Sequence, residues 1–398
     1  MKKNQAVFIL FCIWSAHSVA QENLGSRNLE FSDASIKIEN QIKLDVDQRD
    51  YQRLRSINGQ KVVLQPLELI INGQKTLPKD VHTRGQSTLN FPRKSLSFDV
   101  ETPVEIQHRE FTKEMSHFIL LSLSMDKYYV RNRLAFGLLQ KIGLLEFFFA
   151  FTDLEVNGKS EGIYLAVQRP QDWAIQEENS PIVIRRGYGH KIETSKTSKS
   201  TSKEDTKSYL ESFKSIYKLI QTDSGEQLYT KLSEKMDLEN YMSWLAVNYL
   251  LRNGDYADEV FFYFDSETNR FKIIPWDYDD IFSARPHEGS SPNSESASLL
   301  FSIEDDLDEK ISTDPFLLEK YKEVLRNVCL ALSDEVLADV FEATYSELYP
   351  YYLKEEIIQN VSTDLYKDAN LENLRIELAS DYLFIRGRRD FILEVKGD

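Results

Sequence analysis

Four aspartates fall in two short segments, at positions where they could share one cation. Asp255 follows an apolar helical pattern in RNGDYADE, whereas Asp277, Asp279 and Asp280 follow an aromatic, β-branched run in IIPWDYDD. Clustered carboxylates repel one another unless a cation lies between them. Mg²⁺ suits such a cluster, because it takes one or two carboxylates together with phosphate oxygens. The remaining carboxylate would orient a hydroxyl group or accept its proton. A set of solvated acidic turns would give the same pattern.

A second polar segment runs from Arg84 through GQSTLNFPR to Lys94 and Ser95. Small residues with backbone donors are followed here by cations that enter a predicted strand. Such a loop can hold phosphate oxygens. Surface basic residues beside a proline turn are the alternative interpretation.

The elements that position these residues change type along the chain. Residues 28–110 alternate in the manner of strands, and residues 153–168 predict a hairpin that turns at Asn157-Gly158. Residues 206–252 predict two helices, the second with Asp237 as its N-cap. Residues 260–264 and 271–276 predict a hairpin whose outer ends carry the aspartates, and amphipathic helices follow from residue 315. This order predicts an α+β fold of two lobes, with the site at their junction.

The composition is that of a strongly acidic protein with a large core. The chain has 398 residues, 41% of them hydrophobic, and a net charge of −16. This charge excludes nucleic acid as an expected partner and favours a basic one.

The first twenty residues have the layout of a secretory signal peptide. Lys2 and Lys3 precede the apolar run 6–14, and small residues end this stretch at Ala20. No later stretch has the ~18 apolar residues of a membrane helix. We therefore expect an exported protein, periplasmic, on the cell surface or extracellular, with no integral membrane segment in the mature chain. Cleavage would leave Cys329 alone, in an apolar helical pattern that predicts a buried structural thiol.

Four predicted segments make up the chain. They are the signal peptide (1–20), a strand-rich N-terminal lobe (21–188), a flexible Ser/Thr/Lys-rich insertion (189–208) and a C-terminal lobe with the acidic loops and final helices (209–398). The insertion has almost no apolar residues, which predicts a mobile loop.

Four motifs, in order, resemble those of the CotH (spore-coat protein H) kinase family. RGQSTLNFPRKSLSFDV resembles its Arg-Gly-Asn-Ser and Pro-Lys-Lys-Ser pattern, and DKYYVRNRLAFGLLQKIGL resembles the segment where Arg-Asn opens a helix. DLEVNGKSEGIYLAVQ resembles its Asn-Gly hairpin. NGDYADEVFFYFDSETNRFKIIPWDYDDIF resembles its Asn-x-Asp segment, aromatic strand and Pro-Trp-Asp-x-Asp.

The resemblance implies an atypical protein-kinase-like fold that transfers phosphate from ATP to Ser or Thr of a secreted protein. Asp255 matches the catalytic aspartate and Asp277 the metal-binding aspartate, with Asp279 as a second candidate ligand of Mg²⁺ or Mn²⁺. Lys94 is the candidate phosphate-contacting lysine, and Arg84 supports the same loop. Gln168 ends a strand expected to border the nucleotide. The resemblance also implies a protein substrate, and a basic, Ser-rich segment suits the acidic cleft.

Three positions depart from the family pattern. Gln168 replaces a Glu, Ser283 replaces a Gly, and Val260 replaces an Asn that would contact a second metal. Asp258 and Glu259 are the alternative candidates for that contact. Two alternatives therefore stay open: a pseudokinase that acts as a surface-binding or structural module, and another phosphoryl or nucleotidyl transfer on the same scaffold.

Overall fold

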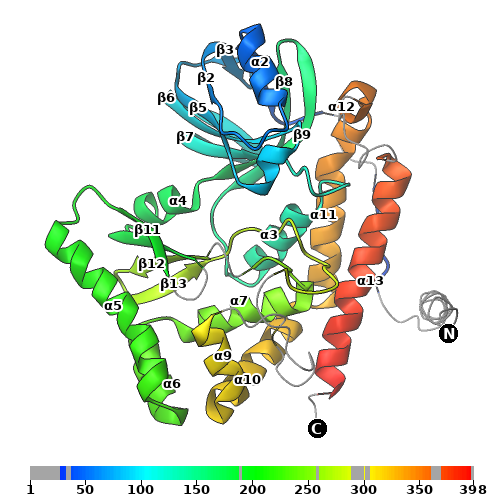
Figure 1. Cartoon of the computed structure of the whole chain (residues 1–398). Coiled ribbons are helices and arrows are strands. Elements are labelled where there is room, and N and C mark those ends of the chain that lie inside the picture. Colours follow the sequence, from blue (N-terminus) through cyan, green and yellow to red (C-terminus); the bar gives the residue numbers. More distant parts are fainter. Residues whose placement is uncertain are drawn as a thin grey trace, which may run out of the picture.

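A computed structural model describes residues 27–32, 37–187, 191–256, 260–287, 300, 305–359 and 369–395. The predicted signal peptide lies outside these residues, as do Asp258 and Glu259. Strands dominate the first half of the chain and helices the second, which confirms the α+β prediction (Figure 1). Within the described residues, no helix is both long and apolar enough to cross a membrane.

Nine strands form the larger sheet, in the order β2-β5-β6-β7-β9-β8-β1-β3-β4. The strands are β1 (Gln41–Val46), β2 (Val63–Leu64), β3 (Pro66–Ile71), β4 (Gln74–Lys75), β5 (Pro78–Arg84), β6 (Ser95–His108), β7 (Phe111–Leu121), β8 (Phe149–Val156) and β9 (Lys159–Gln168). The predicted hairpin at Asn157-Gly158 is confirmed, since β8 and β9 pair antiparallel across it. Helix α2 (Gln48–Arg55) and the short 3₁₀ helix η1 (Ser87–Asn90) interrupt the strands.

The larger sheet lies between two apolar cores, because successive side chains on a strand face opposite sides. Leu120 and Ala166 belong to the core of the strand-rich half, whereas Ile119, Leu165 and Val167 belong to the core shared with the helices. Helix α3 (Arg131–Lys141) fills this second core and is buried over most of its length. The sheet thereby fixes α3 directly behind the junction of the two halves.

A four-stranded sheet of order β11-β10-β12-β13 begins the second half. Its strands are β10 (Ile182–Arg186), β11 (Ile192–Thr197), β12 (Val260–Asp265) and β13 (Arg270–Ile274). The predicted hairpin that carries the aspartates at its outer ends is confirmed as β12 and β13, which pair antiparallel.

Further helices complete the described fold. They are α4 (Pro170–Gln176), α5 (Lys203–Thr222), α6 (Gly225–Ser233), α7 (Leu238–Leu251), α9 (Asp306–Thr313), α10 (Pro315–Ala331), α11 (Asp334–Tyr352), α12 (Glu355–Gln359) and α13 (Leu371–Val395). Asp237 is the N-cap of α7 as predicted, since its side chain accepts a hydrogen bond from the Asn240 N–H. Cys329 is buried in α10, and burial raises the pKa of its thiol to about 12, which fits the predicted structural role.

Within residues 189–208, predicted as a flexible insertion, the structure places regular elements. Residues 192–197 form β11 and pair with β10, and α5 begins at Lys203. Ser202 caps α5 by accepting a hydrogen bond from the Asp205 N–H. Backbone pairing and a helix cap order this tract, and neither depends on the apolar side chains whose absence suggested a loop.

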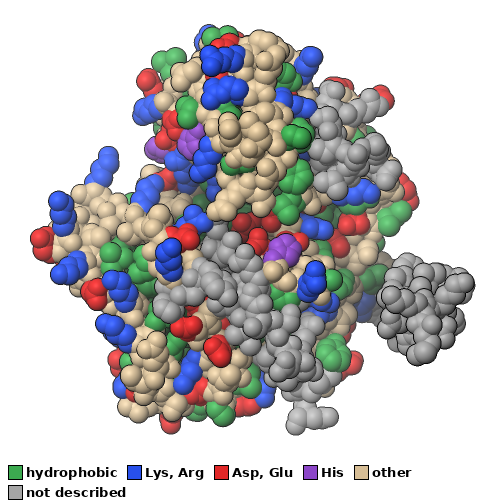
Figure 2. Space-filling view, viewed as in Figure 1, with side chains coloured by type: hydrophobic (Ala, Val, Ile, Leu, Met, Phe, Trp, Pro, Cys, Tyr) green, Lys and Arg blue, Asp and Glu red, His purple; other side chains and the backbone are tan. Residues whose placement is uncertain are grey.

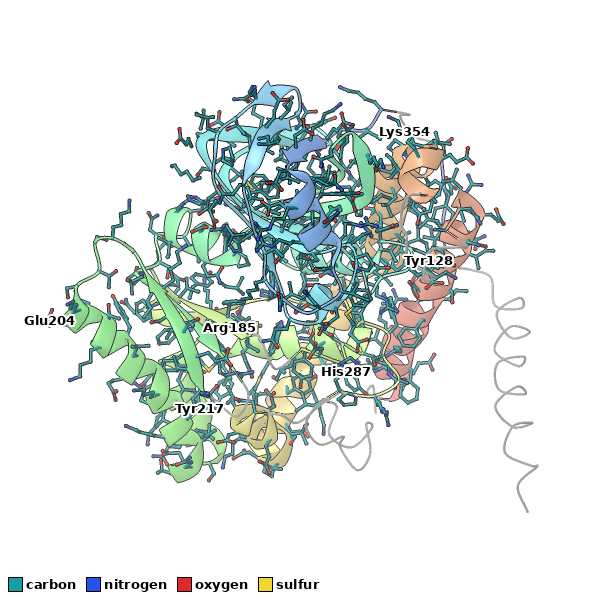
Figure 3. All side chains as sticks on the ribbon, turned by 45° about the horizontal axis from the view of Figure 1, so that its top comes forward. Tyr128, Arg185, Glu204, Tyr217, His287 and Lys354 are labelled. Atoms are coloured by element: carbon teal, nitrogen blue, oxygen red, sulfur yellow. The ribbon has the colours of Figure 1, made fainter. Side chains whose placement is uncertain are left out.

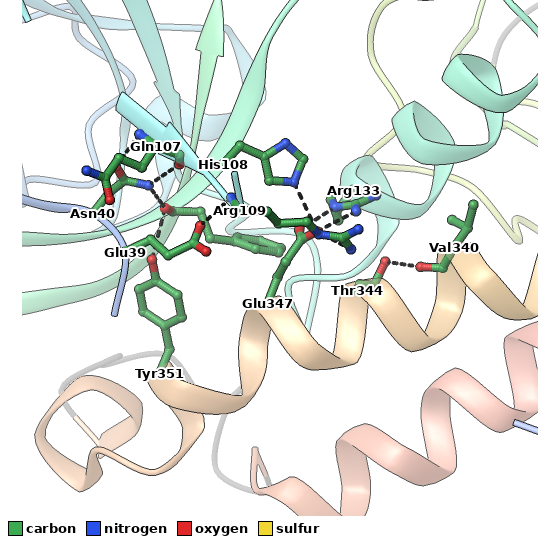
Figure 4. A network of polar contacts seen from close by, with 11 residues as sticks. Glu39, Asn40, Gln107, His108, Arg109, Arg133, Val340, Thr344, Glu347 and Tyr351 are labelled. Carbon is green, nitrogen blue, oxygen red and sulfur yellow. Dashed lines mark hydrogen bonds and ion pairs between the residues drawn. The ribbon is translucent and has the colours of Figure 1, made fainter. Parts of the chain in front are cut away.

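A buried ion-pair network joins the two halves behind the site (Figure 4). Glu347 of α11 binds both Arg133 of α3, at 2.6 and 2.7 Å, and His108 at the end of β6, at 3.0 Å. Arg109 adds a contact of 2.8 Å. Burial alone would raise the pKa of the Glu347 carboxyl, but the Arg133 guanidinium, and then the contact with His108, hold it far below its usual range.

Candidate functional site

Three of the predicted site segments meet around one cavity of about 220 Å³ between the halves. It is lined by Arg84, Gly85, Gln86, Ser87, Thr88, Ser95, Leu121, Leu123, Ser124, Met125, Asn132, Asp255, Trp276, Asp277, Asp279 and His287. Acidic side chains gather near the middle of this face of the molecule (Figure 2). His287, labelled in Figure 3, lies 2.9 Å from the Asp280 carboxylate. The structure thus brings together Asp255, Asp277, Asp279 and Arg84.

Asp255 owes its place to a sharp turn after α7. Arg252 ends the helix in the left-handed conformation, with φ of 51°, so the chain reverses toward the cavity. Asn253 follows, and its side chain is completely buried. Its Oδ1 accepts a hydrogen bond from the Asp255 N–H at 3.3 Å, and its Nδ2 donates to the Asp277 carbonyl at 3.0 Å. This side chain joins the two aspartate segments, together with main-chain hydrogen bonds such as the one from the Gly254 N–H to the Asp280 carbonyl, of 3.0 Å.

The acidic loop (residues 277–280) leaves β13 in a strained conformation. Asp277 has φ of 63°, a left-handed geometry that costs a non-glycine residue on the order of 1 kcal/mol or more. Side chains from α3 hold the next two residues: Asn132 accepts from the Tyr278 N–H at 3.2 Å, and Arg131 donates to the Asp279 carbonyl at 2.9 Å. With Asn253, three side chains hold three consecutive residues of this loop.

Negative charge accumulates on the acidic loop. Burial, and then the neighbouring Asp280, raise the pKa of the Asp279 carboxyl, while Arg131 and His287 oppose the shift. Asp280 forms an ion pair of 2.9 Å with His287. A Cβ on Gly254 would lie 2.0 Å from the Asp280 carboxylate, so any larger residue there would displace this side chain. A cation bound at Asp279 would offset the repulsion between the two carboxylates.

The loop formed by residues 84–88 faces the acidic loop across the cavity. The Arg84 guanidinium lies over the Trp276 ring, 5.4 Å from its centre. Gly85 has φ of +90°, and a Cβ there would lie 2.3 Å from the Thr88 hydroxyl, which itself donates to the Arg84 carbonyl. The turn therefore needs glycine, and the cation–π contact ties it to the segment that carries Asp277.

Lys94 does not line this cavity, contrary to its predicted role. The side chain is almost fully buried, and its ammonium group donates to the carbonyls of Ser56 and Phe91. Burial, and then Arg55, lower the pKa of Lys94. Ser95 lines the cavity instead, because adjacent residues at the start of β6 face opposite ways.

Gln168 also lies apart from the aspartates. It lines a different cavity of about 1010 Å³, between the β6–β7 hairpin and helices α3 and α11. Its Oε1 accepts from the Phe148 N–H at 3.2 Å, and its amide nitrogen donates to Glu177. Val260 begins β12 and is buried. The structure therefore gives neither residue a contact with the candidate site.

The donor set at the cavity suits a hard cation held partly by a ligand. Among the described residues, no group of three or more His, Cys, Asp or Glu side chains is arranged to hold a metal by itself. Asp255, Asp277 and Asp279 nevertheless line one cavity, and Mg²⁺ uses one or two carboxylates plus phosphate oxygens and water. These residues fit a metal that arrives with a nucleotide.

Sequence reasoning did not assign the residues that position the aspartates. Arg131, Asn132 and Asn253 all belong to the motifs that resemble the family, yet none was given a role. One signal could have found them: each is a polar residue next to an apolar helical run. A polar side chain buried at such a position needs a hydrogen-bond partner.

Known proteins give a consistent assignment. A family model described as CotH kinase protein matches residues 81–392. The chain is also 23% identical, over 339 residues, to the inner spore coat protein H of Bacillus subtilis (strain 168), an alignment that covers 80% of this chain and 87% of that protein. The family match includes every segment around the cavity, from the 84–88 loop to the acidic loop. The chain therefore belongs to the CotH kinase protein family.

Proposed function

We propose that this chain is an exported protein kinase that transfers the γ-phosphate of ATP to a Ser or Thr hydroxyl of another protein. One observation carries the proposal: Asp255, Asp277 and Asp279 share a single cavity with the 84–88 loop. On one wall of the cavity, carboxylates could bind a metal ion and accept the proton of a hydroxyl group. On the facing wall, main-chain N–H groups and a guanidinium group could bind phosphate, and phosphoryl transfer requires this combination.

The roles follow from the positions around the cavity. Asp255 accepts the proton of the acceptor hydroxyl as the hydroxyl oxygen forms its bond to the γ-phosphorus. The bond from that phosphorus to the β–γ bridging oxygen breaks, and ADP leaves. Arg84 and the backbone of Gly85 and Gln86 hold phosphate oxygens, and Ser87 and Thr88 are further donors at the same wall.

A divalent metal would supply charge neutralisation between the aspartates and the phosphates. Asp277 and Asp279 are the residues that would hold Mg²⁺ or Mn²⁺, with Asp255 beside them. The strained φ of Asp277 and the three side chains that fix its loop support this role, since strain of this kind clusters at functional sites.

Export and a protein substrate rest on the sequence and on the relative. The twenty-residue leader has the layout of a secretory signal, and the matched Bacillus subtilis protein is named for the spore coat. A basic, Ser-rich acceptor segment complements the acidic cavity and the net charge of −16.

A pseudokinase is the second candidate, favoured by specific observations. The ammonium group of Lys94 is engaged by two main-chain carbonyls, and Val260 presents a buried apolar side chain where the family has Asn. A chain with these features could bind a nucleotide without turning it over. A nucleotidyl transfer on the same scaffold would instead add a nucleoside monophosphate to the product.

Transfer of labelled γ-phosphate tests the proposal. Purified mature protein is incubated with Mg²⁺ or Mn²⁺ and labelled ATP, alone and with a basic, Ser-rich peptide, beside Asp277→Ala. Label that appears in the wild type and disappears in the variant is the expected result. ATP binding without labelling would reject the kinase in favour of the pseudokinase, and a nucleoside monophosphate in the product mass would establish nucleotidyl transfer.

A further inference from the structure

The two sheets have four edge strands, and three of them are short or closed. β2 and β4 end the larger sheet and have two residues each. β13 ends the smaller sheet, but the segment before α7 closes it: Phe271 exchanges main-chain hydrogen bonds with Lys235 and Asp237, and Asn240 accepts from the Ile273 N–H. A closed or very short edge cannot pair with another chain.

β11 is the exception among the described strands. It has six residues, pairs only with β10, and its residues are exposed or half-buried throughout. The Ser198 N–H donates to the Pro181 carbonyl, and Ser195 and Thr197 lie opposite Ile184 and Ile182. Since bonded and non-bonded pairs alternate in an antiparallel ladder, the main-chain N–H and C=O groups of Ser195 and Thr197 point away from β10.

β11 also starts at the end of the sheet that carries the aspartates. Ile192 lies opposite Arg186, and Arg186 lies opposite Val260, so these residues form one row across the sheet. Val260 follows the Asp255 loop, and Ile274, which opposes the next residue of β12, precedes the acidic loop. A chain paired with β11 would therefore have one end directed toward the site.

Basic side chains flank this edge. Lys191 and Lys199 lie on either side of β11 and Lys203 begins α5, and none has a described carboxylate within ion-pair distance. Lys196 is different, because it contacts Asp172 of α4. Lysine and arginine side chains stand out on the projecting part of the molecule that contains α5 and β11 (Figure 2). Residues 191–207 have five lysines against three acidic residues, Glu193, Glu204 and Asp205, which leaves a local net charge of +2 in a protein of net charge −16. This local balance favours an acidic partner.

We propose that β11 docks the protein substrate by strand addition: an extended, acidic segment of that protein pairs with Ser195 and Thr197. This inference rests on the proposed kinase function and adds a second contact, separate from the acceptor hydroxyl. Strand addition combines main-chain hydrogen bonds for affinity with side-chain contacts for selectivity, as in known peptide-recognition domains.

The geometry also sets the distance from docking segment to acceptor. An added strand lies three strand spacings from β12, about 14 Å, which about five extended residues can span. β11 runs away from the site. A segment that pairs with it antiparallel therefore runs toward the site, and its acceptor residue follows the docking segment in sequence.

Two synthetic peptides and two pairs of variants test the docking. The long peptide has a six-residue Val/Glu segment, a five-residue Gly/Ser spacer and a basic Ser acceptor; the short peptide has the acceptor alone. Ser195→Pro and Thr197→Pro each remove an outward N–H, which an edge strand tolerates, whereas Ser195→Val and Thr197→Val keep it. Binding is followed by fluorescence anisotropy without ATP, and backbone amide exchange is measured at residues 195 and 197.

The long peptide is expected to bind the wild type at least about tenfold more tightly than the short one and to slow exchange at both amides. The proline variants lose this difference and the valine variants retain it. Equal affinity of the two peptides for the wild type, or unchanged binding in the proline variants, would overturn the proposal. Dimerisation that the proline variants abolish would also overturn it, because a second copy would then occupy the edge.

The peptide-binding measurement is repeated on Asp277→Ala, which should bind the long peptide like the wild type but transfer no phosphate. Docking that persists without any phosphate transfer by the wild type would reject only the proposed kinase. Labelling of both peptides with equal KM, unaffected by the proline variants, would reject only the docking site.

Discussion

Asn253 Nδ2 donates to the main-chain carbonyl of Asp277 at 3.0 Å, while Oδ1 of the same side chain accepts from the Asp255 N–H. The two aspartates proposed for proton acceptance and metal binding are thus tied together by one buried amide. The two aspartates belong to different loops. Main-chain hydrogen bonds such as Gly254 N–H to the Asp280 carbonyl also join these loops, but the Asn253 side chain is bonded to both aspartate residues themselves.

Replacing Asn253 with Leu is expected to reduce activity more than stability. The change leaves buried main-chain groups without partners, which costs about 1–3 kcal/mol of unfolding free energy. The variant keeps the main-chain hydrogen bonds between the two loops but loses both side-chain contacts to the aspartate residues, so the two carboxylates should shift relative to each other. Phosphate transfer should then fall about a hundredfold, since a misplacement of reacting groups by about 1 Å costs that much. Denaturant unfolding and initial rates provide the two measurements.

Asn253→Asp is the matched control for that variant. The carboxylate still accepts from the Asp255 N–H but cannot donate to the Asp277 carbonyl, so activity should remain low. Wild-type rates in Asn253→Asp would show that the contact with Asp277 is not needed.

Arg131 and Asn132 are expected to act on metal and nucleotide affinity. Arg131 holds the Asp279 carbonyl and Asn132 the Tyr278 N–H, so either Arg131→Lys or Asn132→Ala loosens the acidic loop. Loss of one such bond costs about 1 kcal/mol, which corresponds to a several-fold weaker apparent affinity for Mg²⁺ and ATP. Titrations of each ligand against the rate measure the effect.

Lys141→Ala serves as the control on the same helix. Its ion pair with Asp339 spans 3.6 Å at the surface, and such pairs contribute little. Equal losses of affinity in the Lys141 and Arg131 variants would mean that α3 acts only through overall stability.

Variants of Lys94 and Arg84 should differ in effect: the first should change stability and the second nucleotide binding. Lys94→Met removes a buried donor from the Ser56 and Phe91 carbonyls, so it should lower the free energy of unfolding while ATP affinity in the folded protein is retained. Arg84→Ala should weaken ATP binding with a smaller effect on unfolding. The reverse pattern would restore Lys94 as the phosphate-contacting residue. Fluorescent-nucleotide binding and thermal unfolding distinguish the two patterns.

Local sequence patterns were enough to predict the elements that are formed by residues close together in the chain. The β12–β13 hairpin, the Asp237 cap and the hairpin at Asn157-Gly158 depend on residues close in sequence, and each is confirmed. The two aspartate segments meet because one hairpin joins them. The 84–88 loop reaches the same cavity from a distant part of the chain, as the family motifs implied.

The places where the structure departs from these predictions have a different origin. Lys94 and Ser95 are neighbours, so whether the lysine or the serine faces the cavity depends on the strand register, which a motif does not specify. Gln168 faces another cavity for a related reason, since tertiary packing sets the direction of a strand end. The 189–208 tract was expected to be a mobile loop because it has almost no apolar residues. The pairing of β11 with β10 uses main-chain groups, which composition does not reveal.

Glu347 is expected to be essential for stability rather than for chemistry. Glu347→Gln leaves the buried Arg133 guanidinium without its counter-charge, and breaking a buried pair of this kind costs about 3–5 kcal/mol. Thermal unfolding should therefore occur at a much lower temperature, with ATP affinity unchanged in protein that remains folded. Glu342→Gln, which removes a more exposed pair with Arg27, is the control and should change little.

Asp126 gives the fold a pH dependence that can be isolated. The carboxyl is buried next to Arg131, and burial raises its pKa from 3.8 to about 6, although Arg131 opposes the shift. Asp381 and Glu377 of α13 lie near Asp126 and Arg131. The pKa of Asp381 is raised by burial, and then by the carboxyls of Glu377 and Asp126. Both buried acids therefore bind protons more tightly in the folded chain than in the unfolded chain.

Protonation of Asp126 thus favours folding. Its contribution is fully present below about pH 4 and is lost as pH rises to about 6, and a two-unit shift corresponds to about 3 kcal/mol. Asp126→Asn stays neutral at every pH, so its stability should decline less between pH 4 and 6. The Tyr128 and Arg131 N–H groups bond different oxygens of the carboxyl, and the single amide oxygen of Asn can accept only one of them, so the variant should be less stable at pH 4. Denaturant unfolding at several pH values compares the two proteins. Parallel curves would show that Asp126 does not titrate in this range, and a steeper decline in the variant would reverse the assigned direction.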